Sequence, residues 1–134
     1  MPSIIDVEGI GEKYTAKLQA AGIKTTEKLL EMGATPKGRK EIAEKTGISD
    51  KLILEWVNLA DLYRIKGVGS EYSDLLEEAG VDTVVELGNR NPANLFKMLE
   101  ESNAKKKLVR KLPTEAQVKD WVDQAKKLPR VVTY

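Results

Sequence analysis

The sequence contains no cysteine and no histidine, and only 5% of its residues are aromatic. Without cysteine the chain has no disulfides, no thiolate metal ligands and no thiol nucleophile. Without histidine it lacks the commonest general base and the commonest metal ligand. No paired carboxylates, phosphate loop or metal-ligand spacing stands out. We therefore expect a protein that is not an enzyme and that uses no metal, no cofactor and no small-molecule substrate.

Long apolar runs are also missing, and none approaches the length needed to cross a bilayer. Residues 1–6 have neither the basic start nor the apolar middle of a secretory signal. We therefore expect a soluble, cytoplasmic protein with no membrane partner. The 134 residues are 41% hydrophobic and 32% charged, a globular balance that allows one substantial core or two small ones.

The formal net charge is only +1, so the chain lacks the overall field of a strongly basic nucleic-acid-binding domain. The charges are unevenly distributed. Residues 67–104 hold two basic and eight acidic side chains, a net charge of −6. Residues 105–134 hold nine basic and three acidic side chains, a net charge of +6. The basic C-terminal end favours a polyanionic partner.

An internal repeat covers most of the sequence. Residues 7–14, Val-Glu-Gly-Ile-Gly-Glu-Lys-Tyr, reappear as residues 65–72, Ile-Lys-Gly-Val-Gly-Ser-Glu-Tyr, an offset of 58. Further along, Trp56 matches Trp121 at an offset of 65, so the second copy carries extra residues, most simply around positions 103–110. We predict one copy over residues 3–61, a second over residues 62–128 and a tail over residues 129–134.

Each copy has the pattern of four to five short helices. Gly22 followed by Ile23 is typical of a left-handed helix end with an apolar contact. Threonine, serine or asparagine precedes the other helices, where its side chain caps the first turn, and Glu86 and Gln117 complete capping boxes. These caps are Thr25, Thr35, Ser49, Thr83, Asn91 and Thr114. The patterns predict an all-α fold, with only the tail extended.

The two Gly-apolar-Gly turns are the most informative motif. The first glycine permits a backbone conformation closed to other residues, the apolar residue anchors the turn, and the second glycine opens the next helix. Free amides at such a helix start bind anions such as a phosphodiester. Alternatively, the turn only joins two antiparallel helices tightly. Two such turns in register favour a helix-hairpin-helix protein. Because Trp56 and Trp121 occupy inward helical positions, we expect core packing for both, and we also predict packing for Tyr14 and Tyr72.

A resemblance to known families rests on the glycine turns, the Ala21-Gly22-Ile23 segment and the downstream Thr46-Gly47-Ile48-Ser49. They resemble the tandem helix-hairpin-helix domain of archaeal and eukaryotic RecA-like recombinases and the C-terminal domain of the bacterial RNA polymerase alpha subunit. Over its whole length the chain is more similar to a bacterial family of duplicated domains, domain-of-unknown-function family 4332. In the DNA-binding relatives, hairpin amides and nearby basic side chains grip the phosphate backbone without reading sequence.

Carried onto this chain, the resemblance implies DNA contacts at three glycine turns, and neighbouring basic residues add candidates. Lys37, Arg39 and Lys40 surround Gly38 at a helix start, where such a cluster is as often a solvated face. The candidate DNA-binding residues are Gly9, Ile10, Gly11, Lys13, Lys37, Arg39, Lys40, Gly47, Ile48, Lys66, Gly67, Val68 and Gly69.

Some residues depart from the DNA-binding pattern. Residues 111–114 replace the second hairpin of the second copy and contain proline instead of glycine, so we expect that turn to be structural. Acidic side chains near the glycine turns would repel phosphate. They are Glu8, Glu12, Glu71 and Asp74. The densest basic run is Lys105, Lys106, Lys107, Arg110 and Lys111, which could follow a nucleic-acid backbone, meet an acidic partner or solubilise a loop.

Two functions remain open at this point. The chain could be a sequence-nonspecific DNA-binding module, or a protein-interaction module whose hairpins are only architectural. The repeated glycine turns and the basic C-terminal end favour DNA as the partner. The near-neutral charge and the acidic residues beside the turns favour a protein. DNA binding, weak and sequence-nonspecific, is our first hypothesis.

Overall fold

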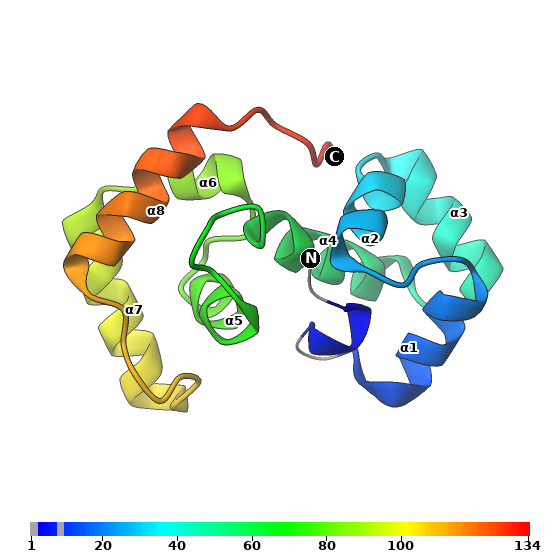
Figure 1. The fold of residues 1–134 in the computed structure, drawn as a ribbon, viewed down its shortest axis with the longest axis horizontal. Coiled ribbons are helices and arrows are strands. Elements are labelled where there is room, and N and C mark those ends of the chain that lie inside the picture. The colour runs from blue at the N-terminus through cyan, green and yellow to red at the C-terminus, as the bar shows by residue number, and fades with distance from the viewer. Residues whose placement is uncertain (1–2, 8–9) are drawn as a thin grey trace. The chain divides into compact units, whose positions relative to one another are not determined.

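The computed structural model describes residues 3–7 and 10–134, and there it consists of eight α-helices and one short 3-10 helix, with no strand (Figure 1). The all-helical prediction is confirmed for these residues. No helix within them is both long and apolar enough to cross a membrane. The elements are η1 (Ile4–Asp6), α1 (Gly11–Ala20), α2 (Thr26–Gly33), α3 (Pro36–Thr46), α4 (Asp50–Leu62), α5 (Ser70–Glu78), α6 (Val84–Gly88), α7 (Pro92–Lys106) and α8 (Glu115–Lys127).

The chain divides into two compact units. Unit 1 comprises Met1–Asp61 together with Val131–Tyr134, and unit 2 comprises Leu62–Arg130. In unit 1, α2 packs on α3 and α1 contacts η1. In unit 2, α8 packs on α6 and α7, while α5 packs on α7 (Figure 1). Unit 1 therefore contains a segment from the far end of the sequence.

The helices begin at the capping residues that the sequence predicts. Thr25, Thr35, Thr83, Asn91 and Thr114 each accept a backbone hydrogen bond in the first turn of the following helix. Ser49 accepts from the Leu52 amide at 3.3 Å. The Thr114 capping box with Gln117 is complete, whereas the Glu86 carboxylate pairs with Arg90 at 2.9 Å. Local side-chain hydrogen bonds thus determine where most helices begin.

The predicted glycine stop of α1 is present, and α5 ends in the same way. Gly22 has φ +89° and Gly80 has φ +93°, both in the left-handed region. The next amides turn back into the helix: Ile23 N–H donates to Leu18 O at 2.9 Å, and Val81 N–H donates to Leu76 O at 2.8 Å. Both apolar residues after these glycines are fully buried, so each stop also anchors the next segment in the core.

A tyrosine packs against a tryptophan in each unit. Trp56 is 1% exposed and lies 5.2 Å from Tyr14 between ring centroids, with the planes 57° apart. Trp121 is 2% exposed and lies 5.2 Å from Tyr72, with the planes 52° apart. Tilted pairs at this distance add to the free energy gained from burial. The prediction that these four rings serve packing is confirmed.

Candidate nucleic-acid interface

The hairpin of residues 67–69 lies between α4 and α5. Gly67 has φ +98°, so the turn requires a residue that tolerates the left-handed region. Val68 is buried and anchors the turn in the core of unit 2. Gly69 then caps α5 in an extended conformation, with φ −107°, and provides no side-chain hydrogen bond. Because a helix leaves its first amides without intrahelical acceptors, the start of α5 presents uncapped donors.

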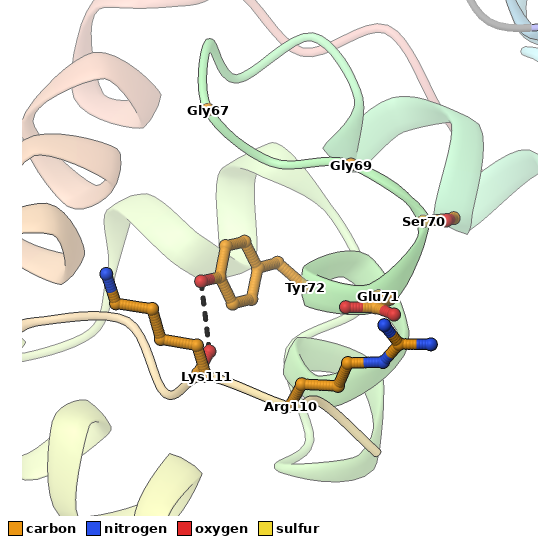
Figure 2. Close-up of a pocket in the computed structure, with 7 residues that line it drawn as sticks. All are labelled: Gly67, Gly69, Ser70, Glu71, Tyr72, Arg110 and Lys111. Atoms are coloured by element: carbon orange, nitrogen blue, oxygen red, sulfur yellow. Dashed lines mark hydrogen bonds between the residues drawn. The ribbon is translucent and has the colours of Figure 1, made fainter.

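A pocket of about 390 Å³ lies at this hairpin (Figure 2). Gly67 and Gly69 form one wall together with the first residues of α5. Arg110 and Lys111, from the loop between α7 and α8, form the other wall. The remaining lining residues are Ser70, Glu71 and Tyr72. Two basic residues and a helix start therefore line one pocket, and the Arg110 guanidinium extends toward the start of α5 while the Lys111 amine points away from it (Figure 2).

Hydrogen bonds within unit 2 hold both walls of this pocket. The Tyr72 hydroxyl donates to the backbone oxygen of Lys111 at 3.0 Å and fixes the loop beside α5 (Figure 2). On the hairpin side, Gln124 of α8 bonds the backbone of Lys66 twice. Its Oε1 accepts from the Lys66 amide at 2.9 Å, and its Nε2 donates to the Lys66 oxygen at 3.1 Å. The pocket is thus held in shape before any ligand binds.

Replacing Gln124 with alanine should loosen the hairpin. The variant loses both hydrogen bonds to Lys66, and water replaces them because Lys66 is exposed. We expect the free energy of unfolding to fall by only about 1 kcal/mol, with faster hydrogen exchange at the Lys66 amide. Asp123→Ala, at an exposed neighbouring position of α8, should leave that exchange rate unchanged. Equal exchange in both variants would rule out the clamp.

The electrostatics of the pocket are mixed. Arg110 and Lys111 supply positive charge, while Glu71 lines the same pocket and opposes an anion. In the same basic run, Lys106 pairs with Glu78 at 2.8 Å. The hydrogen bond and the negative charge of Glu78 both raise the pKa of Lys106 above its usual value. Lys106 is therefore paired with Glu78 of α5. Arg110 and Lys111 are the residues of this basic run that line the pocket.

Several candidate amides already have acceptors inside the units. The Ile10 amide donates to Val7 O at 3.3 Å, and the Val68 amide donates to Ile65 O at 3.1 Å. The Gly47 amide donates to Ala43 O at 2.8 Å. The Ile48 amide donates to the Thr46 hydroxyl at 3.2 Å. The donors of these four residues close the turns, and the side chains of Ile10, Ile48 and Val68 fill the core.

Arg39 also makes its hydrogen bonds inside unit 1. Its side chain is buried, and its guanidinium donates to the backbone oxygens of Gly33, Ala34 and Thr133 at 2.8, 3.1 and 2.6 Å. Burial lowers the pKa of this guanidinium, and Tyr134 acts in the opposite direction. Arg39 is a packing residue. Its neighbours Lys37 and Lys40 are exposed, and Lys40 lines a separate pocket of about 370 Å³ with Asp50 and Lys51.

The remaining candidates lie at or near the two Gly-apolar-Gly turns. Gly9 lies outside the described residues. Gly11 opens α1 with φ +68°, and no side-chain hydrogen bond caps this helix. Lys13 and Lys66 are exposed, one beside each turn. Among the predicted site residues that the structure describes, only Gly67 and Gly69 line the pocket that also contains Arg110 and Lys111.

The sequence indicates Arg110 and Lys111 as part of a basic run but does not connect them with the glycine hairpin. Lys111 lies 39 residues from its hydrogen-bond partner Tyr72, and no local pattern connects the two positions. The available signal was the density of positive charge in the segment where the second copy departs from the first. That segment is the wall opposite the hairpin.

These features define the class of the protein: an all-helical chain of two compact units, with a polar pocket at an interhelical glycine turn of the second. The chain belongs to the family described as a domain of unknown function (DUF4332), which matches residues 8–128. The similarity to domain-of-unknown-function family 4332 that the sequence indicates is confirmed. Searches among the curated proteins and among the solved structures gave no match.

Proposed function

We propose that the two units are tandem helix-hairpin-helix repeats and that the chain is a non-enzymatic module that binds DNA through its phosphate backbone. The repeat interpretation is supported by features common to both units: the glycine stops of α1 and α5, the proline-started α3 and α7, and the tyrosine–tryptophan pairs. One contact site is the pocket of Gly67, Gly69, Arg110 and Lys111. The observation that carries the proposal is an uncapped helix start in a pocket that two basic residues line.

The proposed interface contacts phosphate groups and not base edges. Backbone amides and two long cationic side chains position a phosphate, and phosphate contacts carry no sequence information directly. Few charges are involved and Glu71 opposes them, so binding is weak, in the nonspecific range of roughly 10⁻⁴ to 10⁻⁶ M at physiological salt. Affinity falls as salt rises because bound phosphates release counterions.

The double variant Arg110→Glu with Lys111→Glu tests the site. We expect it to weaken binding to labelled duplex DNA at low salt by about tenfold or more, because two charge-assisted contacts become repulsive. The matched control is Lys97→Glu with Lys119→Glu on exposed faces of α7 and α8. Each pair changes the formal net charge from +1 to −3. Fluorescence anisotropy at two salt concentrations measures the result.

Equal losses in both double variants would mean that only net charge matters and would exclude the pocket. If the parent shows no salt-dependent binding even at low ionic strength, DNA binding itself is excluded. The second candidate, a protein-interaction module, would then take its place. The internally bonded amides of Ile10, Gly47, Ile48 and Val68 favour that candidate because they give those turns an architectural role.

A further inference from the structure

The segment Val131–Tyr134 is docked on unit 1, although α8 of unit 2 precedes it in the chain. The Thr133 amide donates to the backbone oxygen of Ala34 at 2.8 Å, and the Thr133 hydroxyl reaches the same oxygen at 3.3 Å. Val132 is 1% exposed. The docking thus combines a backbone hydrogen bond with one buried apolar side chain.

Arg39 holds the segment from the other side. Its Nη2 donates to the backbone oxygen of Thr133 at 2.6 Å. Its guanidinium carbon lies 5.9 Å from the centre of the Tyr134 ring, within the range of a cation–π contact. The Tyr134 hydroxyl bonds Asn58 of α4, 3.1 Å from its Oδ1. Both the amide and the oxygen of Thr133 are therefore recognised, which is how proteins hold an extended peptide.

The surface that receives the segment is positioned by contacts of its own. The Nη1 of Arg39 donates to the backbone oxygens of Gly33 and Ala34, which lie at the end of α2. A Cβ atom on Gly33 would lie 2.5 Å from Val57 Cγ2, so this glycine permits close packing against α4. These two hydrogen bonds of Arg39 do not involve the segment. We name the surface of Gly33, Ala34, Arg39 and Asn58 the Arg39 slot.

The contacts define what the Arg39 slot accepts. Two hydrogen bonds go to the backbone of one residue, so they select an extended conformation and not a particular side chain. Selectivity comes from Val132, which is buried, and from the hydroxylated ring of Tyr134, which reaches Asn58. The ligand class is an extended, uncharged segment with a β-branched residue two positions before a tyrosine.

We infer that the Arg39 slot is a peptide-binding site, and that the resident Val131–Tyr134 segment exchanges with the same segment of a second copy of this chain. Every copy carries both the slot and the segment, joined to α8 by residues 128–130. In one copy the segment competes at an effective concentration in the millimolar range, so exchange requires high concentration or a disabled resident segment.

Two variants separate the slot from the segment. Val132→Asp introduces a charge at the buried position and should empty the slot, while Arg39→Gln disables the slot and leaves a usable segment. We expect each variant alone to be monomeric by sedimentation velocity, and their mixture to form a heterodimer. Val131→Asp, at a half-buried neighbouring position, is the matched control and should not replace Val132→Asp in the mixture.

The parent chain provides a test that does not depend on the folding of any variant. A peptide with the sequence of residues 130–134, Arg-Val-Val-Thr-Tyr, is added in excess to the ¹⁵N-labelled protein. We expect the Thr133 amide resonance to move to its undocked position, while a peptide with aspartate in place of the second valine leaves it unchanged. A Thr133 resonance that does not move at several millimolar peptide overturns the inference. So does a folded Val132→Asp variant that binds neither this peptide nor the Arg39→Gln chain.

Discussion

Replacing Trp121 with alanine is expected to lower the free energy of unfolding by about 3–5 kcal/mol, the usual cost of deleting a buried tryptophan side chain. Trp121 is 2% exposed and belongs to the core of unit 2. The variant also removes the ring that packs on Tyr72 at 5.2 Å. Urea denaturation followed by circular dichroism measures the loss.

The same substitution should disturb the candidate site. A Cβ atom on Gly67 would lie 3.1 Å from Trp121 Nε1, so the indole lies directly against the hairpin. Without the indole, we expect faster hydrogen exchange in residues 66–69 and weaker binding of DNA. Trp121→Phe keeps a ring against Tyr72 and should lose less than half as much stability. A Trp121→Ala variant as stable as the parent would contradict this account of the core.

Gly38→Ala is expected to destabilise the protein by about 3 kcal/mol, near the upper end for overpacking. A glycine-to-alanine substitution usually changes the stability in the opposite direction. At an exposed helical position, alanine is more stable than glycine by about 1 kcal/mol. An added Cβ atom would lie 2.0 Å from the backbone oxygen of Met32, and neither backbone can move without separating α2 from α3. The clash, and not helix propensity, decides the outcome.

Gly69→Ala is the matched control for Gly38→Ala. No atom lies within 4 Å of a Cβ atom added there, and φ is −107°, which alanine adopts without strain. We expect a loss of about 1 kcal/mol or less, because alanine is a poorer N-cap than glycine but meets no steric clash here. Thermal unfolding of the two variants gives the comparison. If Gly38→Ala melts at or above the parent temperature, the close approach of α3 to Met32 is refuted.

The close approach of Gly38 to Met32 changes the interpretation of the basic cluster of residues 37–40. The sequence indicates a possible phosphate contact, since Lys37, Arg39 and Lys40 surround a glycine at a helix start. In the structure only the two lysines are exposed, while Arg39 is turned inward and Gly38 allows the helix to approach α2. Charge alone cannot distinguish a phosphate contact from internal packing, because the sequence does not show which side chains of a first helical turn face the core.

The fold was largely predictable because its signals are local. A threonine or asparagine side chain caps a helix through an amide two or three residues away, and a glycine ends one through its own backbone. The similarity to domain-of-unknown-function family 4332 required only the residues themselves and was confirmed over residues 8–128. The division at Asp61 and Leu62 was expected from the repeat, but the return of Val131–Tyr134 to unit 1 was not.

By itself, the sequence determined the helical architecture, the tryptophan cores and the absence of cysteine and histidine chemistry. These properties follow from residue type and from spacings of a few residues. Tertiary structure alone decided that the Arg39 guanidinium bonds the backbone of Thr133 and that Arg110 and Lys111 line the hairpin pocket. The physical reason is that a donor or a charge acts through its nearest partners in space. For these residues, the decisive partners lie far away in sequence. Tyr72 and Lys111 are 39 positions apart, and Arg39 and Thr133 are 94 positions apart.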